Sequence, residues 1–220
     1  MFFLCVIFAI MGIINFTSFI LASLIFVVSP GIDTMFVLNK SIIQGKKAGI
    51  YAAMGICIGV LIHTTLAAFG LSLLLAKSAL AFSIIKYLGA AYLIYLGVLK
   101  LILQKKSQQT LAPTVSVTPS PGKIFLAAIL TNTLNPKVAI FFLAFFPQFI
   151  SPVAMVNALP FILLGSTYAF LSLLWFSILA LFAGAFTNKL QSNSLFSYWL
   201  NKCSAIIFIL TGLKIAFTRR

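Results

Sequence analysis

Asp33 is the only Asp or Glu in this chain of 220 residues, and it lies in a long apolar stretch just after Pro30 and Gly31. A charge isolated at the centre of a bilayer costs about 2.5 to 3.5 kcal/mol even on the insertion scale, so such a residue indicates a functional site. Proline lacks an N–H donor and glycine is flexible, so this pair predicts a helix break that exposes backbone polar groups to a cavity. We therefore predict a polar site at Asp33. The alternative is that Asp33 only caps the second half-helix.

A second polar break interrupts an apolar segment in the other half of the chain. Its polar residues and its proline are Asn132, Asn135, Pro136 and Lys137. Aligned at the two prolines, residues 29–33 match residues 135–139, and each motif lies in the first span of its half. A half with three spans crosses the membrane an odd number of times, so the second copy enters from the opposite side. Paired helix breaks in inverted repeats indicate a transporter site near the middle of the membrane.

The chemistry of these two breaks fits a zwitterion. The N-termini of half-helices carry partial positive charge and N–H donors that suit a carboxylate, while Asp33 can accept an ammonium group or a proton. Lys137 is predicted to pair with Asp33 when the site is empty or to help hold the substrate carboxylate; the alternative is that its side chain extends to the membrane surface. The predicted substrate-binding and ion-binding residues are Pro30, Gly31, Asp33, Asn132, Asn135, Pro136 and Lys137.

His63 is the only histidine of the chain, and it is predicted to lie within the second span. Its reference pKa is close to neutrality, so it could relay protons to the site; the alternative is a hydrogen-bonded interior residue. One Asp and one His on different spans supply little acid–base chemistry, so we predict no catalytic residues and no enzyme. The three cysteines are far apart and form no CxxC motif, so we predict no metal site and no cofactor. They are Cys5, Cys57 and Cys203.

The elements that position these residues must be membrane-spanning helices. The chain is 62% hydrophobic and 7% charged, with a mean hydropathy of +1.18, far from the composition of soluble domains. A spanning helix needs roughly 20 apolar residues, so the length allows about six of them and leaves no room for a soluble domain. The net charge of +14 is spread along the chain, which argues against nucleic-acid binding. The apolar runs are continuous rather than alternating, which excludes a β-barrel.

The predicted fold is an all-α integral membrane protein with six transmembrane helices, arranged as two inverted three-helix repeats with broken helices one and four. We predict one transporter domain over 1–220, with repeat one at about 11–103, a linker at 104–123 and repeat two at about 124–217. The predicted spans are 2–39, 48–76, 80–103, 124–149, 153–186 and 197–217. The first is interrupted at 15–18 and 29–31, and Gly55 with Gly59 forms a GxxxG that predicts close helix packing.

The distribution of lysines predicts the orientation. Lysines follow span one, flank the linker and lie between spans five and six, which predicts that these loops are cytoplasmic and that both termini are outside. The first ten residues have no basic region and no cleavage pattern, so no signal peptide is predicted, and Met11 is a second candidate start. Lys86 and Tyr92 are predicted either to line the cavity or to anchor span three at the interface. A cluster of phenylalanines is predicted to face lipid or the core: Phe141, Phe142, Phe145 and Phe146.

Several motifs occur in order along the chain: SPGID at 29–33, QGKKAG at 44–49, GAAYLIYLG at 89–97, Asn132 with NPK at 135–137, and FPQF at 146–149. Together they resemble the motifs of the LysE/RhtB family of amino-acid exporters. The resemblance covers nearly the whole chain from Met11, and it implies that Pro30, Gly31, Asp33, Asn135 and Pro136 fall on the family's signature positions. Family members commonly have a second proline where this chain has Ile32, which should leave the break less rigid.

The resemblance implies a six-span protein of the cell inner membrane that exports amino acids such as homoserine, threonine, leucine or basic amino acids, driven by a proton or cation gradient. We predict an exporter of small neutral amino acids in which Asp33 alternates between a proton and the substrate's ammonium group. Its partners are then the substrate, the coupling proton or cation and the bilayer. The sequence leaves open whether the protein forms a homodimer. Alternatives are basic amino acids, another cargo such as a metal ion, or a channel or non-transporting scaffold.

Overall fold

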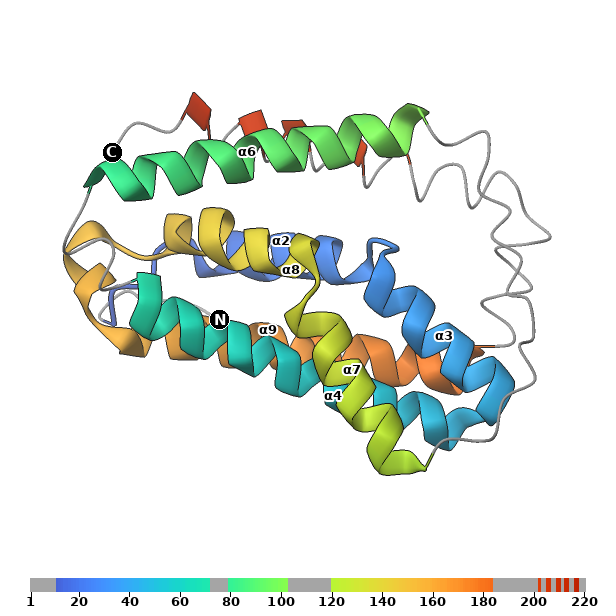
Figure 1. Ribbon diagram of the computed structural model, residues 1–220. Coiled ribbons are helices and arrows are strands. Elements are labelled where there is room, and N and C mark those ends of the chain that lie inside the picture. The colour runs from blue at the N-terminus through green and yellow to red at the C-terminus, as the bar shows by residue number, and fades with distance from the viewer. Residues whose placement is uncertain are drawn as a thin grey trace.

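The computed structural model describes residues 11–71, 79–102 and 120–183, together with residues 202, 205, 206, 209, 210, 212, 213, 216 and 217. Within this described part the chain is helical and contains no β-strand, apart from one isolated bridge between Ile13 and Ile150. Figure 1 shows helices packed side by side along most of their length. The predicted all-α class is therefore confirmed.

The helices follow the predicted spans closely. They are α2 (Phe16–Val28), α3 (Ile32–Gln44), α4 (Lys46–Leu66), α6 (Ala79–Ile102), α7 (Pro121–Thr133), α8 (Pro136–Ile140) and α9 (Ala158–Leu181). Short π turns at η1 (Ala67–Leu71) and η3 (Phe141–Phe145) extend α4 and α8, and 3₁₀ turns form η4 (Phe146–Phe149) and η5 (Pro152–Val156). Most of predicted span six lies outside the described residues.

Several predicted boundaries were wrong. Span one was expected to end at residue 39, but α3 continues to Gln44. Residues 121–123, assigned to the linker, form the first turn of α7, because Pro121 stands at a helix start where its missing N–H has no helical partner to lose. Span five was expected from residue 153, but α9 begins only at Ala158. Asn157 stops the preceding 3₁₀ turn and caps α9, since its side chain accepts a hydrogen bond from the backbone N–H of Leu159.

Both predicted helix breaks are present as sharp bends. The axes of α2 and α3 differ by 53°, and the axis of α7 differs by 48° from that of the segment Pro136–Phe149. Two continuous helices are long and apolar enough to cross a membrane, Lys46–Gly70 and Ala158–Leu181, and each bent pair also qualifies if it is counted as one span. The protein is therefore a multi-pass membrane protein by the length and composition of its described helices.

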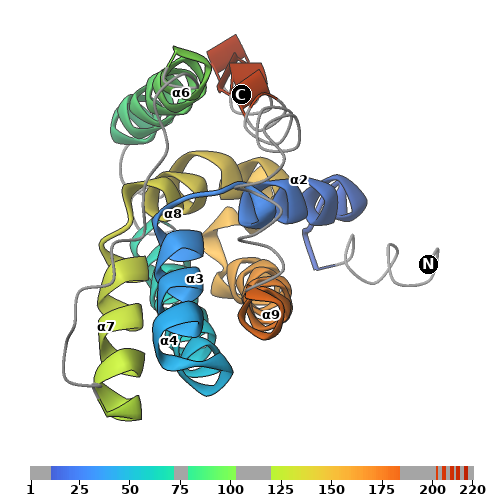
Figure 2. The ribbon, with the colours of Figure 1, turned by 90° about the vertical axis from the view of Figure 1, so that its right-hand side faces the viewer.

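The helices form three layers. α6 lies on one side, α2 and α8 form the middle, and α3, α4, α7 and α9 form the other side (Figures 1 and 2). Gly55 and Gly59 let α4 approach α7, because a Cβ at Gly55 would lie 2.6 Å from Cβ of Ala128 and one at Gly59 would lie 2.7 Å from Cβ of Asn132. The packing role predicted for the GxxxG is confirmed, and it brings the last turn of α7 against α4.

The middle layer is held by aromatic packing. The predicted phenylalanine cluster is core rather than lipid-facing, since Phe141, Phe142 and Phe146 are fully buried. Phe19 from α2 packs edge-on against Phe146 with ring centroids 5.5 Å apart, so it ties α2 to the segment after α8. Burial of such large rings contributes much of the packing energy of a core.

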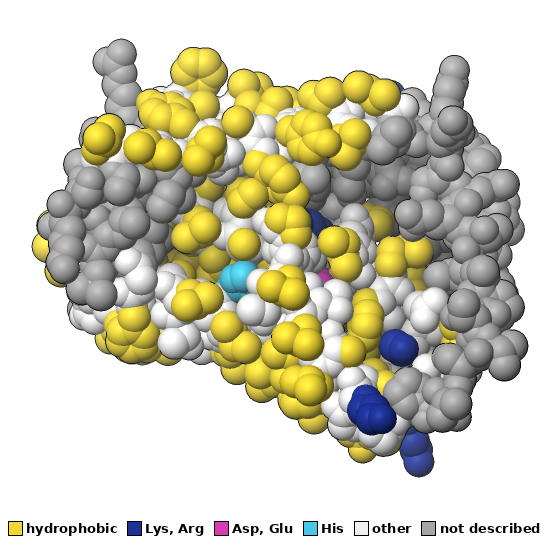
Figure 3. Space-filling view, viewed as in Figure 1, with side chains coloured by type: hydrophobic (Ala, Val, Ile, Leu, Met, Phe, Trp, Pro, Cys, Tyr) yellow, Lys and Arg dark blue, Asp and Glu magenta, His cyan; other side chains and the backbone are white. Residues whose placement is uncertain are grey.

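One end of the molecule is basic. The α3–α4 connection and the start of α7 lie together at the lower right of Figure 1, and Figure 3 shows Lys and Arg side chains gathered at that end. Hydrophobic side chains cover most of the coloured remainder of that face, as expected for a surface in contact with lipid. The predicted orientation, with this end in the cytoplasm, stays a prediction.

Candidate functional site

The first break places the acid in the interior. α2 ends at Ser29, and Gly31, in an extended conformation, precedes the first turn of α3. Asp33 lies in that turn and is 7% exposed. Its Oδ2 accepts a hydrogen bond of 2.8 Å from the side-chain amide of Asn132, whereas Oδ1 has no hydrogen-bond partner among the described residues. The carboxylate therefore bonds across to α7 and does not cap its own helix.

At the second break, residues of the break itself provide hydrogen-bond partners for the exposed backbone groups. Asn135 precedes α8, and its Oδ1 accepts a hydrogen bond of 3.0 Å from the backbone N–H of Lys137. Pro136 occupies the first helical position, where proline's fixed φ favours a helix start. The backbone N–H of Asn135 also donates to the carbonyl of Asn132 at 3.0 Å. This half-helix therefore begins with a side-chain cap, whereas α3 has none.

Lys137 joins the second break to the first. Its Nζ donates to the carbonyl oxygens of Phe26 at 2.9 Å and Ser29 at 2.8 Å, and it lies 4.8 Å from the centroid of the Phe26 ring. In an uninterrupted helix the Phe26 carbonyl would accept from residue 30, but Pro30 has no N–H to donate. The lysine side chain thus bonds to the end of α2 rather than extending to the membrane surface.

His63 contacts the backbone of Asn132. Its Nε2 lies 3.2 Å from the carbonyl oxygen of Asn132, and its ring stacks on Phe142 with centroids 5.6 Å apart. A carbonyl only accepts hydrogen bonds, so Nε2 carries the proton in this contact. His63 is buried and is not among the residues that line the cavity described next.

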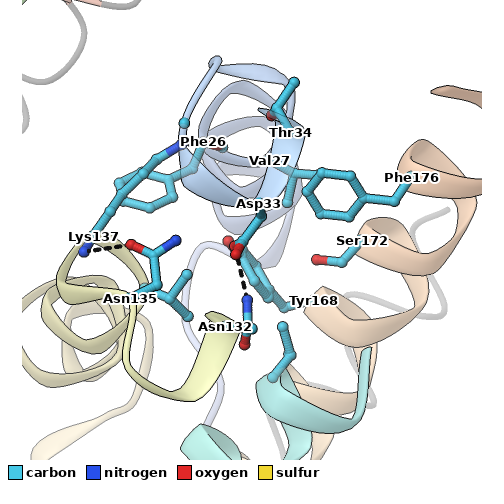
Figure 4. Close-up of a pocket in the computed structure, with 13 residues that line it drawn as sticks. Phe26, Val27, Asp33, Thr34, Asn132, Asn135, Lys137, Tyr168, Ser172 and Phe176 are labelled. Carbon is cyan, nitrogen blue, oxygen red and sulfur yellow. Dashed lines mark hydrogen bonds between the residues drawn. The ribbon is translucent and has the colours of Figure 1, made fainter. Parts of the chain in front are cut away.

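A cavity lies between the two breaks and α9, and its lining combines polar and apolar side chains (Figure 4). Its polar side chains are Asp33, Thr34, Asn132, Asn135, Lys137, Tyr168 and Ser172. Its apolar side chains are Phe26, Val27, Val60, Val138 and Phe176, and Gly31 completes the lining. Five predicted site residues therefore line one cavity. Pro30 and Pro136 do not line it but form the breaks on either side.

Sequence reasoning missed the wall that α9 supplies. Tyr168, Ser172 and Phe176 follow one another at spacings of four residues, which places them on one face of α9. Figure 4 shows this face turned toward Asp33. The available signal was that Tyr168 and Ser172 are a polar pair at helical spacing in a mostly apolar span.

Other candidates lie elsewhere. Tyr92 packs beside Tyr95 on α6, with ring centroids 6.2 Å apart, and is not a lining residue; the side chain of Lys86 lies outside the described residues. The Cys57 thiol donates to the carbonyl of Ala169 at 3.6 Å, while Cys5 and Cys203 lie outside the described part. Within the described ranges, no group of three or more His, Cys, Asp or Glu could hold a metal ion.

Comparison with known proteins gives a family. The family model "LysE type translocator" matches residues 24–219. The chain is 36% identical over 181 residues to "Leucine efflux protein" of Salmonella typhimurium (strain LT2), which covers 82% of this chain and 84% of that protein. It is also 36% identical over 194 residues to "Uncharacterized membrane protein YrhP" of Bacillus subtilis (strain 168), with 86% and 91% covered. No solved structure matches the chain.

Both matches extend over most of the chain, and the family-model match includes both helix breaks and the residues that line the cavity. The resemblance inferred from the motifs is confirmed, and the chain belongs to the LysE family of membrane translocators.

Proposed function

We propose that this protein is a secondary transporter that exports small neutral amino acids across the inner membrane, in exchange for protons or another cation. The observation that carries the proposal is the cavity in which the only acid of the chain lies beside the N-terminal end of a half-helix, with apolar side chains in the same lining. The relatives named "Leucine efflux protein" support the same class of cargo.

The polar groups of the cavity fit the two charged groups of an amino acid. Asp33 Oδ1, which has no hydrogen-bond partner among the described residues, can accept the ammonium group. The first turn of α3 presents N–H groups that have no partner inside the helix, and no side chain caps them, so they can donate to the carboxylate. α8 fits this role less well because Asn135 already caps it.

The apolar residues of the lining favour a substrate with a neutral side chain. Val27, Val60 and Phe176 provide hydrophobic surface but no charge. A basic amino acid would need a second acid for its side chain, and a metal ion would need several, whereas Asp33 is the only acid in the chain. Leucine-like substrates match this lining, with a single acid and several apolar side chains, best.

The transport cycle follows from this placement. In our proposal Asp33 binds a proton in one state and the ammonium group of the substrate in the other, so the two cannot occupy it together. The broken spans α2–α3 and α7–α8 move around the site. The proposal includes six spans in two inverted repeats, at about 11–103 and 124–217, because paired breaks are typical of such transporters.

Counterflow in proteoliposomes tests the proposal. Liposomes containing the purified full-length protein are loaded with one unlabelled amino acid from a panel, and uptake of the labelled amino acid is followed with and without a pH gradient. We expect saturable exchange of leucine or a similar neutral amino acid that the gradient accelerates. No exchange of any amino acid would contradict the proposal and favour another cargo or a scaffold.

The variant Asp33→Asn tests the role of the acid in transport without changing the shape of the side chain. The amide keeps the shape of the side chain but cannot bind a proton or counter an ammonium charge, so we expect exchange to fall by about a hundredfold or more. Asp33→Glu keeps the charge and is expected to retain part of the activity. Both variants are compared with wild type for the amount of monodisperse protein recovered from the membrane. Exchange at the wild-type rate in Asp33→Asn would refute the role of the acid.

A further inference from the structure

Several groups that attract a positive charge meet at the end of α2. The carbonyl oxygens of Phe26 and Ser29 converge on one point, where Lys137 Nζ lies 2.9 Å and 2.8 Å from them. The face of the Phe26 ring lies 4.8 Å from the same atom and adds a cation–π attraction. The C-terminal end of a helix also carries partial negative charge. Every one of these features attracts a positive charge.

Such an arrangement has a known use in membranes. In transporters with broken helices, unwound carbonyls and the C-terminal ends of half-helices coordinate the coupling sodium ion. Here the positive charge at this place belongs to the protein itself. It is attached to α8, in the other broken span, through the side chain of Lys137.

We propose that the ammonium group of Lys137 is a tethered cation that fills a monovalent-cation site at the end of α2, so that the transport cycle needs no alkali-metal ion. The site claim depends only on the geometry of the break. The claim about the cycle rests on the proposed export function. A variant that lacks the lysine side chain therefore acquires a vacant site for Na⁺, K⁺ or NH₄⁺.

The first test measures cation binding without transport. Thermal unfolding of purified Lys137→Ala is followed in choline chloride and in NaCl, KCl or NH₄Cl at equal ionic strength. We expect at least one small cation to raise the Tm of this variant saturably, while the Tm of wild type is the same in all four salts. Choline, a large organic cation, is the reference for ionic strength. An equal Tm for Lys137→Ala in all salts would overturn the site.

The second test measures whether transport depends on an alkali-metal ion. Counterflow by wild type should proceed at the same rate in choline buffer and in sodium buffer. The counterflow rate of Lys137→Ala should be roughly tenfold lower in choline buffer, which is the scale of a lost charged hydrogen bond. Most of this rate should return when the cation identified by the Tm measurement is added. A wild type that requires Na⁺ or K⁺ would overturn the proposal, as would full activity of Lys137→Ala in choline.

Two further variants make the outcome specific. Lys137→Gln can still donate to the carbonyls but carries no charge, so it should lose activity if the cation matters; wild-type activity would overturn the proposal even if Lys137→Ala fails to fold. Lys40→Ala removes another lysine over a ring, 5.6 Å from the Phe36 centroid, and should show no cation dependence. If no variant and no wild-type protein exchanges amino acids but the Tm shift appears, the export proposal fails and the site stands.

Discussion

The two helix breaks of this protein have the same cause but different surroundings. In each, a proline stands four residues after a carbonyl that it deprives of its helical donor: Pro30 after Phe26, and Pro136 after Asn132. In each, a basic side chain from another element contacts that carbonyl. It is Lys137 at the first break and His63 at the second.

The breaks differ in how their second half-helix begins. Asn135 caps α8 with its own side chain, whereas Gly31 before α3 has no side chain and the nearby acid bonds across to Asn132. The first break therefore leaves the N-terminus of α3 without a side-chain cap, whereas the N-terminus of α8 is capped by the protein itself. In our proposal, similar sequence motifs thus produce one binding element and one supporting element.

Among the variants that test this comparison, the largest effect is expected from replacing Pro30. Pro30→Ala supplies an N–H that can donate to the Phe26 carbonyl in place of Lys137, so α2 and α3 can join and the site is lost. We expect counterflow to fall by about tenfold or more, whereas Pro136→Ala should lose only about twofold because Asn135 still caps α8. Equal losses in counterflow would show that the two breaks do the same work.

An intermediate effect is expected from the caps. Asn135→Ala and Asn157→Ala each remove a side chain that caps a helix, α8 inside the site and α9 outside it. Each should lower the free energy of unfolding by about 1 kcal/mol, but only Asn135→Ala should also slow counterflow, by roughly threefold. Denaturant titration and counterflow on the same preparations separate the two effects. A matching loss of counterflow in Asn157→Ala would contradict a specific role for the second break.

The smallest effect is expected at His63. His63→Gln keeps an N–H that can donate to the Asn132 carbonyl, so counterflow should stay within about twofold of wild type. His63→Leu cannot donate and should be slower. If His63→Gln keeps counterflow but loses acceleration by a pH gradient, His63 relays protons and the interior role is wrong.

Much of the fold could be predicted because membrane helices are long apolar runs that end at recognisable residues. The bounds of α6 and the break at Pro30 lie within one or two residues of the predicted places. Lys137 could not be assigned, because a lysine side chain can reach a membrane surface, an acid or a carbonyl, and spacing along the chain does not choose among them. Tyr168 was missed for a similar reason, since only the packing of α9 shows which of its faces meets the cavity.

The sequence by itself determined that the chain is a multi-pass helical membrane protein of the LysE family, with two breaks and one acid, because hydrophobic run length and proline act locally. Only the tertiary structure decided which partners complete the breaks. Asn132 reaches Asp33 across 99 residues of sequence, and Lys137 reaches Phe26 across 111. A buried polar group must find a partner wherever the fold brings one, and that choice depends on the packing of helices far apart in the chain.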